Sequence, residues 1–78
     1  MKVVLYGALA DAIGRSVDID APDGLSVGRL REQLRRDHPN AEREIARSRA
    51  IIGSAAVSDD HCAGEADQVE FLPPVSGG

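Results

Sequence analysis

The segment that starts at Ser26 has the apolar spacing of a single, well-defined amphipathic helix. Val27, Leu30 and Leu34 recur at intervals of three and four residues, which places their side chains on one helical face. Ser26 can cap the first turn, and Pro39 disfavours helical geometry in the residue before it, so we expect the helix to stop within residues 37–40. On the other faces we expect solvated charged side chains, namely Arg29, Arg31, Glu32, Arg35 and Arg36. One helix of this kind can cover one face of a small sheet.

Four segments around this helix have the composition of strands. The predicted strands span residues 2–6, 16–20, 50–57 and 68–72. Gly53 interrupts the third strand and predicts a bulge or a close backbone approach there. Between the strands we expect a helical turn over residues 8–13, a short helix over 40–47 anchored by Ile45, and irregular structure over 61–67.

The order of these elements predicts an α+β domain with a β-grasp, ubiquitin-like arrangement. We expect a mixed sheet of four to five strands packed on the one main helix, with a hairpin before the helix and a right-handed crossover. We also expect the last strand in the centre of the sheet, beside the first. The chain therefore divides into a β-grasp domain over residues 1–72 and a flexible, extended C-terminal tail over 73–78 that ends in Gly-Gly.

The composition limits the kinds of function that this chain can have. With 78 residues it makes one domain whose core holds about a dozen side chains, so a deep active-site cleft is not expected. The net charge of −4 argues against nucleic-acid and membrane partners, because both require a basic face. Cys62 is the only cysteine, which excludes an internal disulfide and a multi-cysteine metal site and favours a cytoplasmic location. No metal site is predicted.

The tail has the properties of a chemical arm. Pro73-Pro74 ends the last strand and favours an extended chain, so six residues can reach about 20 Å. Gly77 and Gly78 have no Cβ atoms, and they fit a narrow channel in another protein. A free carboxylate on Gly78 resists nucleophilic attack until adenylation by ATP makes AMP the leaving group. A persulfide sulfur can then displace AMP and leave a thiocarboxylate.

The chain resembles the small subunits of molybdopterin synthases, in the MoaD/ThiS family of ubiquitin-like, β-grasp sulfur carriers. The resemblance extends over the whole length, and the tail is its most specific part. The matching segments are residues 71–78 (FLPPVSGG), residues 3–8 (VVLYGA), Gly14, Ser26-Val27 and residues 67–69 (DQV).

The resemblance implies a carrier that is not an enzyme by itself. Gly78, with Gly77 beside it, would be the site of adenylation and of the thiocarboxylate, and the residues that bind partners would be Leu72, Pro73, Pro74, Val75 and Ser76. The implied partners are an adenylyltransferase related to ubiquitin-activating enzymes, a sulfurtransferase or cysteine desulfurase as sulfur source, and the large, catalytic synthase subunit. No cofactor is bound by the chain, because ATP is used by the activating enzyme. The sulfur would form the dithiolene of molybdopterin.

Three other functions remain open on the sequence. The chain could carry sulfur for thiazole, cysteine or another thio-metabolite, with the same tail chemistry. It could be a ubiquitin-like modifier that is joined to lysines of target proteins. It could also be an interaction module whose tail never reacts.

The remaining reactive and aromatic residues favour structural roles. Tyr6 and Phe71 are the only aromatic residues, and we expect both in the core. Cys62 is expected as a small, buried or half-buried hydrophobic residue. His61 adjoins it, but neighbours in an extended segment point apart and seldom form a nucleophile and base pair.

Overall fold

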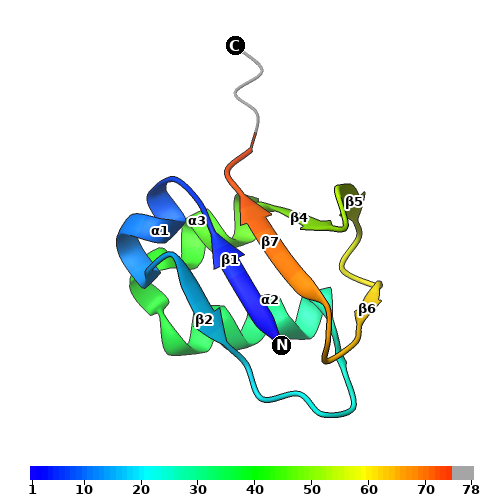
Figure 1. Cartoon of the computed structure of the whole chain (residues 1–78). Coiled ribbons are helices and arrows are strands. Elements are labelled where there is room, and N and C mark those ends of the chain that lie inside the picture. The colour runs from blue at the N-terminus through cyan, green and yellow to red at the C-terminus, as the bar shows by residue number, and fades with distance from the viewer. Residues whose placement is uncertain (75–78) are drawn as a thin grey trace.

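The computed structural model describes residues 1–74, which form a sheet with one long helix packed across one face (Figure 1). The strands of this sheet are β1 (Lys2–Leu5), β2 (Ser16–Asp18), β4 (Arg49–Ile52), β5 (Ala55–Val57) and β7 (Gln68–Leu72). The helices are α1 (Ala8–Ile13), α2 (Val27–Asp37) and α3 (Glu42–Arg47), with the 3-10 turn η1 (Pro39–Ala41) before α3. Two short strands, β3 (Leu25–Ser26) and β6 (Cys62–Ala63), make a separate pair.

The strand order in the main sheet is β2-β1-β7-β4-β5. β1 pairs antiparallel with β2 and parallel with β7, and β4 lies antiparallel to both β7 and β5. The first hairpin thus precedes the helix, and the last strand lies beside the first in the centre of the sheet. This arrangement confirms the predicted α+β, β-grasp fold with its mixed sheet.

The core lies between the sheet and α2. Val3 and Leu5 on β1 are directly opposite Val69 and Phe71 on β7, and all four side chains are at most 2% exposed. Because side chains alternate along a strand, these residues all point to the face that α2 covers. The buried apolar residues are Val3, Leu5, Leu9, Ile19, Ala21, Val27, Leu30, Leu34, Ala41, Ile45, Ala50, Ala63, Val69 and Phe71.

The predicted helices are confirmed. Ser26 caps α2 by accepting a hydrogen bond from the Arg29 amide at 3.2 Å, and α2 ends at Asp37, just before Pro39. The predicted short helix before residue 47 is the 3-10 turn η1 followed by α3, with Ile45 buried. Within residues 1–74, the helices all fall short of the length and apolar character that a bilayer span requires.

The prediction of one strand over residues 50–57 is wrong. Gly53 and Ser54 have φ values of 56° and 70°, and they form a two-residue turn between β4 and β5, in which Ile52 is opposite Ala55. Two consecutive residues with positive φ are typical of a type I′ hairpin turn, whose twist matches that of the strands. Gly53 therefore reverses the chain and does not make a bulge.

The prediction of irregular structure over residues 61–67 is wrong in part. Cys62 and Ala63 form β6, which is opposite β3 in an antiparallel pair. The loop before β6 also reaches the start of α2, where the Val27 amide donates to the His61 carbonyl at 2.9 Å. The Gly24 turn allows this approach, because a Cβ atom on Gly24 would lie 2.6 Å from the Ala63 carbonyl oxygen.

The expected solvent exposure of Arg31 is also wrong. Its side chain lies on α2 among core residues, and the residue is only 8% exposed. The Nη1 atom donates to the Ile45 and Ser48 carbonyls and to Ser48 Oγ, while Nε and Nη2 donate to Asp59 Oδ1 at 3.2 and 3.1 Å. The guanidinium lies 5.1 Å from the centre of the Phe71 ring. One side chain thus joins α2 to the end of α3, the start of β4 and the loop before β6.

We predict that Arg31→Met destabilises the protein by about 2 to 3 kcal/mol, because the buried Ser48 carbonyl and hydroxyl lose the guanidinium donor. The Ile45 carbonyl keeps the hydrogen bond from the Ser48 hydroxyl at 2.7 Å. The Asp59 side chain is 59% exposed and can return to water, so it adds little to this cost. Urea unfolding at neutral pH measures the effect. Arg36→Met, at an exposed position of the same helix, is the control, and we expect it to change stability by less than about 0.5 kcal/mol. Equal unfolding midpoints for the two variants would contradict the prediction.

Candidate functional site

The predicted tail begins where the central strand of the sheet ends. We call Pro73 and Pro74, the first two tail residues, the tail root. β7 has a hydrogen-bonded neighbour on each side, so the point at which the chain leaves the sheet is well supported (Figure 1). Pro73 also packs against the turn after β1, since a Cβ atom on Gly7 would lie 3.3 Å from Pro73 Cγ. The fold therefore sets the place from which the tail departs.

The structure describes three of the seven predicted site residues. Leu72, Pro73 and Pro74 are consecutive and exposed, as their predicted contact with partners requires. The other four predictions fall outside the described residues, namely Val75, Ser76, Gly77 and Gly78. Their proposed chemistry therefore depends on the family and on the setting of the tail root.

The face of the sheet opposite α2 carries exposed apolar side chains next to the tail root. We call Val4, Tyr6, Ile51 and Leu72 the apolar sheet face. Tyr6 and Leu72 are 41% and 36% exposed and are the large exposed hydrophobic residues of the described chain. Val4 and Ile51 are half-buried and flank Glu70, the residue between them on β7. These side chains therefore form an exposed apolar surface beside the tail root.

The core prediction for Phe71 is confirmed, but that for Tyr6 is wrong. Phe71 is fully buried, whereas Tyr6 follows Leu5 on the opposite side of the strand and faces outward. The prediction of a buried or half-buried Cys62 is also wrong. Its thiol is exposed because Ala63, the next residue of β6, takes the inward position.

Tyr6 and Glu70 form a polar pair on the apolar sheet face. The Tyr6 hydroxyl donates to Glu70 Oε2 at 2.5 Å. This hydrogen bond raises the pKa of Tyr6 above its usual value of 10.0, and partial desolvation and the Glu70 charge add to the shift. The neutral phenol therefore holds the carboxylate in place between its apolar neighbours throughout the physiological pH range.

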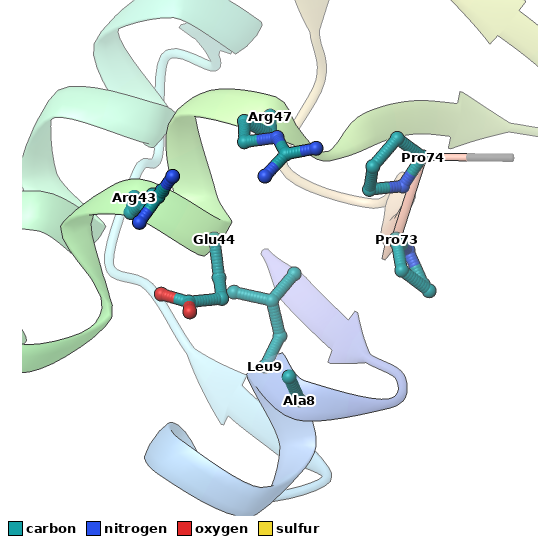
Figure 2. A pocket seen from close by; sticks show the side chains of 7 residues that line it. All are labelled: Ala8, Leu9, Arg43, Glu44, Arg47, Pro73 and Pro74. Atoms are coloured by element: carbon teal, nitrogen blue, oxygen red, sulfur yellow. The ribbon is translucent and has the colours of Figure 1, made fainter. Parts of the chain in front are cut away.

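A pocket lies on the other side of the tail root, toward the helices. Its volume is about 220 Å³, and Figure 2 shows the side chains that line it. We call this the tail-root pocket; it is lined by Ala8, Leu9, Arg43, Glu44, Arg47, Pro73 and Pro74. Sequence reasoning assigned no function to the first five of these residues. Arg43 and Arg47 are four residues apart on α3, which predicts a shared face, but nothing in the sequence places that face beside Pro73.

The described residues of this site carry apolar side chains, two arginines, two carboxylates and one phenol. Neither the apolar sheet face nor the tail-root pocket contains a histidine or cysteine among the residues that the structure describes. Over residues 1–74, no three His, Cys, Asp or Glu side chains are grouped so that they could hold a metal ion. His61 and Cys62 lie on the β3-β6 side of the molecule.

We predict that Glu70→Ala lowers the pKa of Tyr6 toward 10.0, because it removes both the acceptor and the charge that stabilise the neutral phenol. Tyr6 is the only tyrosine, so the phenolate absorbance in a pH titration reports it directly. The stabilisation from this pair is complete below pH 10.0 and is lost as the pH rises through the raised pKa. Glu65→Ala, in an exposed loop, is the control and leaves the titration unchanged. An unshifted Glu70→Ala curve would show that the hydrogen bond does not persist in solution.

Comparisons with known proteins agree with this geometry over the full chain. A curated protein named molybdopterin synthase sulfur carrier subunit, from Mycobacterium tuberculosis (strain ATCC 25618 / H37Rv), is 25% identical over 80 residues that cover 100% of this chain and 96% of that protein. The crystal structure of SAMP1 from Haloferax volcanii has a TM-score of 0.79 at 26% identity and covers 99% of this chain and 97% of its own. A putative molybdopterin converting factor, subunit 1, from Pyrococcus furiosus has a TM-score of 0.81 at 24% identity, with 95% of both chains covered, and supports the fold.

The family model is the most direct of these comparisons. The model that describes the ThiS family matches residues 3–78, which includes all but the first two residues of the domain and the whole predicted tail. Together with the curated relative, it agrees with the resemblance inferred from the residues themselves. The chain belongs to the ThiS family and is a ubiquitin-like sulfur carrier of the MoaD/ThiS type.

Proposed function

We propose that this chain is the small, sulfur-donating subunit of a molybdopterin synthase and that it carries sulfur as a thiocarboxylate on Gly78. The observation that carries the proposal is the position of Pro73-Pro74, directly after the central strand β7 and next to an exposed apolar face. A similarity that extends over 96% of a curated molybdopterin synthase sulfur carrier subunit supports it. In this role the chain presents its tail in the cytoplasm, and the catalytic site lies on the large subunit.

The chemistry starts with activation of the terminal carboxylate. An adenylyltransferase related to ubiquitin-activating enzymes joins Gly78 to AMP and releases pyrophosphate from ATP. A persulfide sulfur, supplied by a sulfurtransferase or cysteine desulfurase, attacks the acyl carbon and displaces AMP. A thiol then reduces the resulting acyl disulfide and leaves the thiocarboxylate. Gly77 has no side chain and leaves room for each reagent next to the carbonyl.

Delivery of the sulfur requires both reach and orientation. Six residues from Pro73 to Gly78 can extend about 20 Å, which is enough to enter an active site in a second protein. The apolar sheet face docks on the large subunit, and in the sequence Val75 and Ser76 connect the tail root to Gly77 and Gly78. When the carrier is docked at the tail root, its thiocarboxylate is held next to the acceptor. The sulfur transfer then no longer depends on a collision between two free molecules.

We predict that incubation with the activating enzyme, ATP and a persulfide source raises the intact mass by about 16 Da, the difference between sulfur and oxygen. The same mixture without ATP leaves the mass unchanged. Deletion of Gly78 abolishes the change, whereas Ser76→Gly, which alters the tail but keeps both glycines, retains it. An unchanged mass for the intact chain with its cognate enzymes would contradict the proposal.

We predict that Leu72→Asp weakens binding to the large subunit by about 2 to 4 kcal/mol, because it buries an unpaired carboxylate in an apolar interface. Calorimetry with the purified large subunit measures the change. Ala66→Asp is the matched control, since it adds the same charge at an exposed position in the loop before β7, at the end of the strand away from the tail. Equal losses for both variants would exclude the apolar sheet face as the docking surface.

A second function is favoured by the similarity to SAMP1 from Haloferax volcanii, the small archaeal modifier protein 1 of that organism. In this alternative the activated Gly78 is transferred to lysine side chains and forms isopeptide bonds. A denaturing gel of the native host, probed for this chain, separates the two functions, because a modifier gives a series of heavier conjugates. A carrier for thiazole, cysteine or another thio-metabolite gives the same thiocarboxylate, and it is distinguished by the acceptor enzyme that binds it.

A further inference from the structure

The tail-root pocket contains an unusual local excess of positive charge. Arg43 and Arg47 lie one turn apart on α3, and both are exposed. The salt bridge found within residues 1–74 joins Arg31 to Asp59, so neither pocket arginine has an ion-pair partner in the described chain. The pocket has one carboxylate, on Glu44. In a chain whose net charge is −4, this pocket is therefore a surface that attracts an acidic group.

The rest of the pocket is apolar. Ala8 and Leu9 of α1 form one side, and the two proline rings of the tail root form another (Figure 2). In the same view, Arg47 projects from α3 toward Pro74, and Arg43 lies one turn farther along the helix. A hollow of about 220 Å³ with an apolar wall and a cationic rim suits one apolar side chain with a carboxylate next to it.

The pocket and the tail share their residues. Because Pro73 and Pro74 are walls of the pocket, a protein that encloses the tail from its root must contact the pocket as well. The apolar sheet face and the tail-root pocket also lie on opposite sides of the end of β7. Contact with both would hold the root from two sides and set the direction in which the tail leaves the domain.

We propose that the tail-root pocket is a docking site for the enzyme that activates the tail, and that it receives an acidic segment of that enzyme with one apolar side chain. Arg43 and Arg47 pair with the carboxylates, and the apolar side chain fills the space between α1 and the prolines. This inference rests on the proposed function. It applies to every version of that function, since adenylation precedes each possible acceptor. The activating enzyme recognises the carrier through this pocket, whereas adenylation takes place at Gly78.

The test is the ATP-pyrophosphate exchange catalysed by the purified activating enzyme of the same organism, with the full chain as substrate. We expect Arg47→Glu and Arg43→Glu each to raise the KM for the carrier by about five- to tenfold, because reversed charges repel the acidic segment. We expect kcat to stay the same, since the tail still reaches ATP when bound. Higher salt reduces the difference between wild type and variants.

Arg29→Glu is the matched control. It makes the same change in net charge at an exposed position in the first turn of α2, outside the tail-root pocket. Circular dichroism confirms that the variants are folded. A KM that rises equally in Arg29→Glu would mean that net charge alone steers the encounter, and it would overturn the docking site.

The remaining outcomes separate this inference from the proposed function. Exchange with the wild type but an unchanged KM for both pocket variants would overturn the docking site alone. No exchange with the wild type would remove the proposed function and this inference together. If Arg47→Glu weakens only the complex with the large subunit, the occupant is the sulfur acceptor and the proposal is wrong. If the free chain shows NMR distance contacts between residues 75–78 and the side chains of Arg43 and Arg47, the chain's own tail fills the pocket, and the proposal is also wrong.

Discussion

The buried guanidinium of Arg31 is the interaction on which the arrangement of this small domain depends. The group is almost out of water, and it is stable there because the carbonyls of Ile45 in α3 and of Ser48 between α3 and β4, the Ser48 hydroxyl and Asp59 accept its hydrogen bonds. The network holds the end of α3 next to the start of β4. It thereby also sets the position of α3 beside the tail root, where Arg43 and Arg47 line the pocket.

A chain of this size has one helix long enough to cover a sheet, and this leaves the other sheet face free for partners. The covered face carries Phe71 and its buried neighbours, whereas the free face carries Tyr6, Glu70 and Leu72. The same strand, β7, supplies residues to both faces because its side chains alternate. One strand therefore carries both core side chains and exposed side chains, and that strand leads directly into the tail.

The division of work between the carrier and its partners follows from this architecture. The described part of the chain has an apolar sheet face and a pocket with two arginines around the tail root, and neither contains a histidine or cysteine among the described residues. In our proposal the carrier contributes a positioned carboxylate, and its partners contribute ATP, sulfur and the acceptor. In this proposal the activating enzyme binds the tail-root pocket and the large subunit binds the apolar sheet face. The two enzymes would then recognise the same tail root from different sides.

Features that depend on local spacing and on family motifs were predictable from the amino-acid sequence alone. The stripe of Val27 and Leu34, the strand that contains Phe71, the β-grasp order and the sulfur-carrier family were all accessible, because periodicity and motifs are written along the chain. The burial of Arg31, the pairing of β3 with β6 and the position of Arg47 beside Pro74 became known from the three-dimensional structure. Each of these depends on contacts between segments far apart in the chain. Arg31 shows the reason: its neighbours on α2 predict a solvated arginine, and its burial becomes favourable only when Ser48 and Asp59 are brought to it.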